Sequence, residues 1–167
     1  MAAEHGLGSI QSVLLMGAGG AGGAVALALL DQGCDRLVIC DPSGRRAPDL
    51  AHRIAQLRPQ KSVQGVMDVT TLDPKKFDGV VNATPLGMTS YPGMSIDPNV
   101  LSADAWVGDI VYFPLNTQLL NTARAGGHAV MQGRGMAIYQ AVAAFELFTG
   151  TKANPGRMTQ KFISLTK

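Results

Sequence analysis

Residues 13–24 read Val-Leu-Leu-Met-Gly-Ala-Gly-Gly-Ala-Gly-Gly-Ala. The apolar run at the start predicts a buried strand that stops at Gly17, and a helix-forming apolar run begins at Ala24. Between the two, Gly17, Gly19 and Gly22 form the pattern G-x-G-x-x-G. This pattern is weak alone, but between a strand and a helix it indicates a turn that binds the pyrophosphate of a dinucleotide.

Each glycine of the pattern meets a physical requirement of such a turn. Gly17 permits a tight turn after the strand, and Gly19 lets the backbone approach a pyrophosphate without a Cβ in the way. Gly22 lets the helix pack closely against the strand. The free N–H groups at the start of the helix then face the phosphates, with the positive end of the helix dipole behind them.

An acidic residue follows the next predicted strand. Residues 36–40 read Arg-Leu-Val-Ile-Cys, and Asp41 comes 19 residues after Gly22. In dinucleotide-binding folds an acid at about this distance accepts hydrogen bonds from the adenosine ribose, and its charge disfavours the 2′-phosphate of NADP. Arg45 and Arg46 in the following loop could instead hold that phosphate or stack on adenine. We give Asp41 more weight because it ends the strand, which favours NAD. The plainer alternative is a glycine-rich turn in an ordinary α/β protein, with Asp41 as a helix N-cap.

Composition narrows the possible partners. The 167 residues suffice for one domain with a full hydrophobic core. The net charge is +2 and no basic stripe is present, so no nucleic-acid partner is expected. No apolar run reaches the ~18 residues of a membrane span, and residues 1–8 lack the pattern of a signal peptide. These features predict a cytoplasmic protein without a membrane partner.

The cysteines and histidines suggest no metal or redox site. A strand separates Cys34 from Cys40, which places them too far apart for a disulfide and indicates free buried thiols. The histidines show no ligand spacing and are expected at the surface or at loop ends, and no metal site is predicted; they are His5, His52 and His128.

Predicted strands and helices alternate along the rest of the chain. Several strands are continuously apolar, which is typical of a parallel sheet that is covered on both faces. The sequence therefore predicts an α/β fold with a doubly wound, mainly parallel six-stranded sheet of Rossmann type, helices on both faces and strand order 3-2-1-4-5-6. The expected strands are 13–16, 36–40, 63–66, 79–83, 106–111 and 128–131, and the expected helices are 20–32, 46–57, 116–125, 135–149 and 156–164.

Three parts are expected along the chain. Residues 1–12 are interpreted as a linker or the end of an interdomain helix. Residues 13–150 form the dinucleotide-binding domain, and residues 151–167 are a tail with a short helix. Ligands of doubly wound sheets bind at the carboxyl ends of the strands, so we expect function in the loops that follow them.

Two of these loops carry groups suited to a cofactor. Asn82 and Thr84 end the fourth predicted strand and supply hydrogen-bonding groups beside the expected pyrophosphate and ribose, while Pro85 stops the strand. A strand that simply ends in turn-prone residues is the alternative. Gly133 and Gly135 would leave space for a flat ring such as nicotinamide, or they serve turn geometry alone.

Tyr112 and Gln140 are candidates for contact with a substrate. The Tyr112 hydroxyl could reach the cleft, or the residue could be a core tyrosine with its hydroxyl at the rim. Gln140 falls on an apolar helix face, so its amide needs a partner, which is either a substrate hydroxyl or a backbone carbonyl. No lysine or histidine is expected at the strand ends, so no proton donor for hydride chemistry is predicted in this chain.

Longer stretches resemble the shikimate and quinate dehydrogenases. They are Gly-Ala-Gly-Gly-Ala-Gly at 17–22, Asn-Ala-Thr-Pro-Leu-Gly-Met at 82–88, Gly-Asp-Ile-Val-Tyr-Phe-Pro-Leu-Asn-Thr at 108–117, Gly-Arg-Gly-Met-Ala-Ile-Tyr-Gln-Ala at 133–141 and Phe-Glu-Leu-Phe-Thr-Gly at 145–150. The family joins an N-terminal substrate domain to a C-terminal nucleotide domain, and this chain resembles the second. The resemblance implies reversible hydride transfer between a nicotinamide cofactor and the ring alcohol of shikimate or quinate. The family's catalytic lysine and aspartate lie in the first domain, so no catalytic residue is expected in this chain.

The resemblance also implies roles for individual residues. The pyrophosphate is expected on Gly17, Ala18, Gly19, Gly20, Ala21 and Gly22, and the adenosine end on Asp41 and Arg46. The remaining cofactor contacts are expected from Asn82, Ala83, Thr84, Pro85, Ile110 and Gly133, and the contacts to substrate hydroxyls from Tyr112 and Gln140.

The loop at residues 41–46 bears on the choice of cofactor. Its sequence, Asp-Pro-Ser-Gly-Arg-Arg, resembles the NAD-using quinate/shikimate branch, although NADP stays possible.

Without the substrate domain, we expect this chain to bind cofactor but not to turn over substrate, and its C-terminal tail helix to face that domain. The competing hypothesis is a stand-alone NAD-binding sensor without catalysis.

Overall fold

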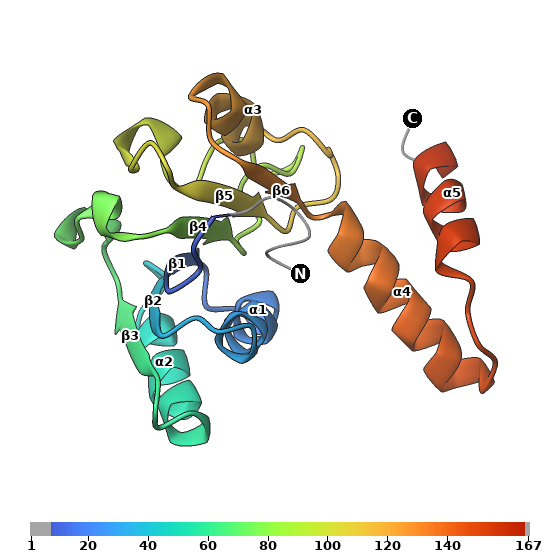
Figure 1. Ribbon diagram of the computed structural model, residues 1–167, viewed down its shortest axis with the longest axis horizontal. Helices are drawn as coiled ribbons and strands as arrows, with labels where there is room; N and C mark the ends of the chain where they lie inside the picture. The colour runs from blue at the N-terminus through green and yellow to red at the C-terminus, as the bar shows by residue number, and fades with distance from the viewer. Residues whose placement is uncertain (1–7, 166–167) are drawn as a thin grey trace.

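The computed structural model describes residues 8–165, and a six-stranded parallel sheet is its centre (Figure 1). The strand order is β3-β2-β1-β4-β5-β6, and every neighbouring pair is parallel. The strands are β1 Ser12–Met16, β2 Arg36–Cys40, β3 Ser62–Val66, β4 Gly79–Asn82, β5 Trp106–Asp109 and β6 Val130–Gln132. The helices are α1 Gly20–Asp31, α2 Arg46–Leu57, α3 Gln118–Ala125, α4 Arg134–Thr149 and α5 Pro155–Leu165. The predicted doubly wound fold is confirmed.

Alternate residues of the strands build two separate cores, one on each face of the sheet. Val13 and Leu15 of β1 pack with Ala26, Leu30 and residues of α2 on one face. The intervening side chains face the opposite way and pack with α3 and the loop before β5. Because successive side chains of a strand point to opposite faces, continuously apolar strands require cover on both, and Figure 1 shows α1 and α2 on one side and α3 on the other.

Element boundaries differ from the predicted ones near β5. The strand was expected to reach Val111 but ends at Asp109, whose side chain accepts a hydrogen bond from the Val111 N–H at 3.0 Å and turns the chain. The next helix begins at Gln118 and not at 116, because the Thr117 hydroxyl caps it by accepting from the Leu120 N–H.

Of the predicted linker at 1–12, residues 1–7 lie outside the described residues. Residues 8–11 contain no helix, and β1 already begins at Ser12. The Ser9 hydroxyl donates to Asp78 at 2.7 Å, and the Trp106 indole donates to the Ser9 carbonyl at 2.9 Å. These bonds hold the segment against the starts of β4 and β5, at the end of the sheet opposite to the glycine turn.

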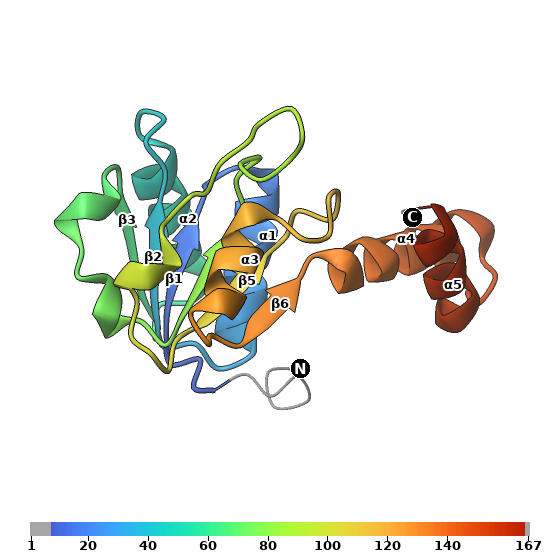
Figure 2. The same cartoon turned by 90° about the horizontal axis from the view of Figure 1, so that it is seen from above.

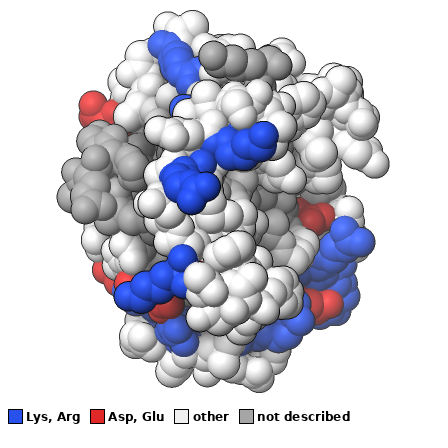
Figure 3. Space-filling model, turned by 90° about the vertical axis from the view of Figure 1, so that its right-hand side faces the viewer, with Lys and Arg blue, Asp and Glu red and all other residues white. Residues whose placement is uncertain are grey.

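The last two helices form an arm that projects away from the sheet (Figures 1 and 2). α4 packs against α5, and of its 16 residues Ile138 alone is buried. Gly150 ends α4 in the left-handed conformation, with φ of 65°, as a glycine cap does. The side of the molecule that carries the arm is largely uncharged, with more basic than acidic groups (Figure 3).

One histidine at a loop end is buried. His128 lies in the loop between α3 and β6, one of the two kinds of position predicted for it, and it is 8% exposed with its Nδ1 2.8 Å from the Ala105 carbonyl. Cys34 and Cys40 are free and buried, as predicted, and burial raises the pKa of both thiols. Within residues 8–165, no helix is long and apolar enough to cross a membrane.

Candidate functional site

The carboxyl ends of the parallel strands gather the predicted site residues on one edge of the sheet. The glycine turn follows β1, Asp41 follows β2, and the loops after β4, β5 and β6 lie beside them. Figure 2 shows the loops after β2, β4 and β5 rising from this same edge. β1 and β4 are neighbours here, so the edge contains the point where the strand order reverses and where such sheets bind their ligands.

Two glycines of the turn are required by the protein's own packing. Gly17 has a φ of 104°, and a Cβ there would lie 2.7 Å from the Ala83 carbonyl oxygen. A Cβ on Gly22 would overlap the Gly17 carbonyl. The turn therefore closes tightly on itself and on the end of β4, which matches the roles predicted for both residues.

The other glycines of the turn leave a ligand free access. A Cβ on Gly19 or Gly20 would meet no heavy atom within 4 Å, so the backbone there faces open space. α1 has no side-chain cap at its N-terminus, so no side chain of the described residues occupies the amide groups of its first turn. Open backbone at an uncapped helix start fits the pyrophosphate of a dinucleotide.

Asp41 joins the end of β2 to the glycine turn. It is 7% exposed, and its carboxylate accepts hydrogen bonds from the Ala18 N–H at 2.9 Å and the Ser43 N–H at 2.8 Å. Burial by itself raises the pKa of this carboxyl, but the bonds from Ala18 and Ser43 and the charge of Arg46 outweigh it and lower the pKa. Each carboxylate oxygen can accept two hydrogen bonds, so Asp41 keeps acceptor capacity for a ribose hydroxyl.

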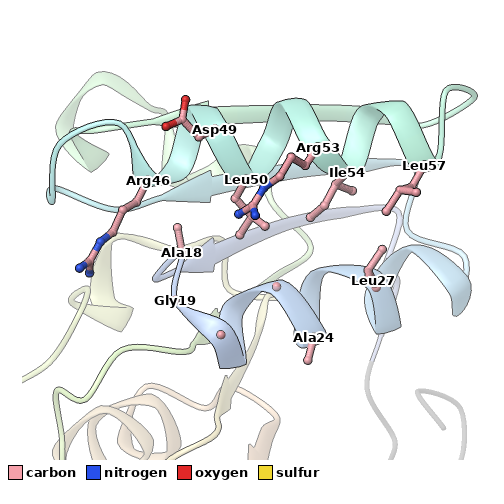
Figure 4. Close-up of a pocket in the computed structure, with 12 residues that line it drawn as sticks. Ala18, Gly19, Ala24, Leu27, Arg46, Asp49, Leu50, Arg53, Ile54 and Leu57 are labelled. Carbon is pink, nitrogen blue, oxygen red and sulfur yellow. The ribbon is translucent and has the colours of Figure 1, made fainter.

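A groove of about 770 Å³ extends from the glycine turn along α1 and α2 (Figure 4). Leu50 and Ile54 of α2 contribute to its apolar lining, and Arg46 and Arg53 reach from α2 toward the side of α1. Arg46 lies at the end nearest Ala18, beside the turn. A guanidinium and apolar side chains next to the phosphate site suit the adenosine end of a cofactor.

The Asn82 side chain is fully buried and holds the loop after β4. Its Oδ1 accepts from the Thr84 N–H at 3.1 Å and the Thr84 hydroxyl at 2.6 Å, and its Nδ2 donates to the Leu86 carbonyl at 3.0 Å. The amide is therefore not exposed to a cofactor as the sequence suggested, and it shapes the loop that contains Ala83, Thr84 and Pro85.

The two glycines after β6 differ in the role that the structure indicates, close packing for Gly133 and open space for Gly135. A Cβ on Gly133 would overlap the Ile110 carbonyl, so this residue lets the β6 loop pack directly on the loop after β5. A Cβ on Gly135 would meet nothing within 4 Å. Ile110 and Gly133, both expected near the nicotinamide, are thus neighbours, and the open space lies beside Gly135.

Tyr112 and Gln140 are both exposed. Tyr112 is 49% exposed, so it is not the core tyrosine of the alternative interpretation, and its ring lies 6.4 Å from that of Phe162 in α5. Gln140 was inferred to lie on a buried apolar face, but that inference is wrong, because α4 leaves the sheet and the residue is exposed.

Sequence reasoning missed Asp109 at the end of β5. It is 2% exposed, with Asn82 and Thr117 as side-chain partners. A signal was present, because Asp109 ends an apolar strand just as Asp41 does. Its partners Asn82 and Thr117 lie 27 and 8 positions away in the chain, so no local pattern shows what the carboxylate binds.

Comparisons with known proteins show which sequences this chain is similar to. Residues 133–161 match the family model described as Shikimate 5′-dehydrogenase C-terminal domain. A quinate/shikimate dehydrogenase (NAD(+)) of Corynebacterium glutamicum (strain R) is 45% identical over 97% of this chain and 58% of its own length. A shikimate dehydrogenase (NADP(+)) of Pseudarthrobacter chlorophenolicus is 41% identical over 93% of this chain and 54% of its own length.

A solved structure gives the same result. The quinate dehydrogenase from Corynebacterium glutamicum in complex with NAD superposes with a TM-score of 0.88 and 43% identity, over 98% of this chain and 58% of that one. The chain thus spans little more than half the length of the relatives it matches. By sequence and by fold, the chain belongs to the shikimate/quinate dehydrogenase family, in which it corresponds to the C-terminal, nucleotide-binding domain.

Proposed function

We propose that this chain is the cofactor-binding half of an NAD-dependent shikimate or quinate dehydrogenase. The observation that carries the proposal is the junction of Asp41 with an open glycine turn, through the 2.9 Å bond from the Ala18 N–H. It places a carboxylate with spare acceptor capacity beside the start of α1. The relative with 45% identity is named as NAD-dependent, which supports the same choice of cofactor, while the NADP-dependent relatives keep NADP possible.

Each residue of the site has a proposed task in binding. The turn from Gly17 to Gly22 holds the pyrophosphate, and Asp41 and Arg46 hold the adenosine end. The cofactor is flanked by Ala83, Thr84 and Pro85, its nicotinamide lies near Ile110 and Gly133, and substrate hydroxyls are reached by Tyr112 and Gln140. A bound nicotinamide nucleotide supplies the hydride acceptor or donor for the ring alcohol.

Hydride transfer to or from an alcohol also needs a group that moves the hydroxyl proton. No lysine or histidine stands among the proposed site residues. We propose that a lysine and an aspartate from polypeptide beyond this chain supply it, together with most of the alcohol-binding pocket. The relatives' lengths support this, since 42% of the corynebacterial enzyme has no counterpart here. The proposed division into a nucleotide domain up to residue 150 and a tail stays a prediction.

The first test is a calorimetric titration of this chain with NAD and with NADP, followed by an assay for shikimate and quinate oxidation. We expect NAD to bind more tightly and neither alcohol to be oxidised. Gly19→Val is the matched control, because its side chain enters open space and blocks the turn without disturbing the packing. Failure of the wild-type chain to bind either nucleotide would overturn the proposed cofactor-binding function. Oxidation of shikimate or quinate by the chain alone would refute the proposal that a lysine and an aspartate from elsewhere are needed.

The arm of α4 and α5 offers a surface for the substrate-binding polypeptide. Leu147 and Phe148 are 81% and 84% exposed, and Tyr139 is 65% exposed. A helix that is apolar on all sides is normally buried. Tyr139, Leu147 and Phe148 therefore need cover that α5 and the rest of residues 8–165 do not provide.

We expect the uncovered apolar side chains of the arm to make copies of this chain associate, and the replacement of Leu147 and Phe148 together by glutamine to reduce that association. The melting temperature should change by less than about 2 °C, because exposed side chains away from special features contribute little to stability. Light scattering at increasing protein concentration measures the effect. Leu57→Gln on α2, where the leucine is 60% exposed, is the control; an equal reduction there would show that the arm is not a special surface.

A further inference from the structure

Three buried polar side chains join the loops on the nicotinamide side of the proposed site. The Asn82 Nδ2 donates to the Asp109 Oδ1 at 2.9 Å, and the Thr117 hydroxyl donates to the Asp109 Oδ2 at 2.7 Å. Their residues are 0%, 2% and 1% exposed. The three come from the end of β4, the end of β5 and the residue before α3, so the network crosses between elements far apart in the sequence.

The network fixes the loop after β4 from two directions. Asn82 binds Thr84 and Leu86, as described above. On the other side, Gly87 has a φ of 102°, and a Cβ there would lie 3.1–3.2 Å from Thr117, tighter than an ordinary contact. Any displacement of Asp109 or Thr117 is therefore transmitted to the loop that contains Ala83, Thr84 and Pro85.

The same carboxylate fixes the loop after β5. The Asp109 Oδ1 also accepts from the Val111 N–H at 3.0 Å, which sets the direction in which Ile110 and Tyr112 leave the strand. The loop after β6 packs on this one, since Gly133 touches the Ile110 carbonyl. One side chain thus governs three loops at the edge of the sheet.

The three hydrogen-bond donors around Asp109 favour a carboxylate in this place over an amide. Three donors converge on Asp109, and a carboxylate is an acceptor at both oxygens, whereas an asparagine replaces one acceptor by a donor. Burial is the larger effect and raises the pKa of the Asp109 carboxyl above its usual value, although the hydrogen bonds from Thr117, Val111 and Asn82 act in the opposite direction. Burying a charge without a cation is costly, and no ion pair of Asp109 exists within residues 8–165.

We infer that Asp109 is a positioning residue, which sets the geometry of the nicotinamide end of the site through Asn82, Val111 and Thr117. The inference rests on the proposed function and adds to it a residue that need not touch the cofactor. The adenosine end depends on Asp41 and on the open backbone at Gly19 and Gly20, and the side chains of the network form no hydrogen bond with Asp41. The two ends of the cofactor should therefore respond differently to a change at Asp109.

The test compares two ligands, NAD and ADP-ribose, which lacks the nicotinamide ring. For Asp109→Asn we expect the Kd for NAD to rise about tenfold and the Kd for ADP-ribose to change less than about twofold. A tenfold change corresponds to about 1.4 kcal/mol. Val107→Ala, a buried residue of the same strand outside the network, is the control for loss of stability and should affect both ligands equally.

A second pair of variants keeps the test decisive if Asp109→Asn does not fold. Thr117→Val removes the hydroxyl and should raise the Kd for NAD selectively, while Thr117→Ser retains it and should restore the wild-type ratio. Equal loss of NAD and ADP-ribose affinity in these variants, or no loss, would overturn the inference. If the wild-type chain binds neither ligand, the proposed function fails instead, and the inference fails with it.

Discussion

Replacing Asp41 by asparagine is expected to raise the Kd for NAD by about 10- to 100-fold and to narrow its advantage over NADP. The Ala18 and Ser43 N–H groups bind different oxygens of the Asp41 carboxylate. An asparagine has a single acceptor oxygen, so it can keep only one of these two bonds, and it has less capacity left for a ribose hydroxyl. Hydrogen bonds to charged groups contribute about 1.5–3 kcal/mol, and about 1.4 kcal/mol corresponds to a factor of ten in Kd. The substitution also removes the charge that disfavours a 2′-phosphate.

Calorimetric titration with NAD and NADP measures this result directly. Asp49→Asn is the matched control, because Asp49 lines the same groove but is largely exposed and pairs with Arg45 across 3.6 Å, away from the turn. Its Kd values should stay close to those of the wild type. Tighter binding of NADP than NAD by the wild-type chain would show that Arg45 and Arg46 dominate the site and that the choice of NAD is incorrect.

Gly22→Ala is expected to destabilise the fold by about 3 kcal/mol, the upper end of the usual cost of overpacking. The added Cβ overlaps the Gly17 carbonyl, which is backbone and cannot rotate away as a side chain can. The melting temperature should fall by about 10 °C, and binding of NAD should weaken because the turn is displaced. Thermal unfolding followed by circular dichroism measures the loss.

Gly23→Ala is the control for that substitution. It adds the same methyl group one residue later in the same helix, where a Cβ would lie 3.6 Å from the Leu50 side chain, an ordinary contact. Alanine is favoured over glycine within a helix by about 0.5–1 kcal/mol, so this variant should be slightly more stable than the wild type. If both variants lose stability equally, helix packing in general and not the closed turn explains the loss.

The arm explains why one prediction about a site residue was wrong. Gln140 was expected to be buried because its helical neighbours are apolar, an inference that treats an apolar face as one that packs on the sheet. In the structure, α4 leaves the sheet and packs on α5, so the face is exposed. Apolar composition shows that a surface is suited to burial, but which surface covers it depends on neighbours outside the helix.

The sequence by itself determined the sheet order, the glycine turn and the position of Asp41 after β2. These features follow from local patterns, namely apolar runs, glycine spacing and the fixed hand of parallel crossovers. Only the tertiary structure decided that Asp41 binds Ala18, that Asn82 is enclosed, and that Asp109 joins three loops. These contacts connect residues 23 and 27 positions apart. Residues so far apart in the sequence come together only when the strands align side by side. The periodicity of apolar residues along the chain does not show which polar groups then meet.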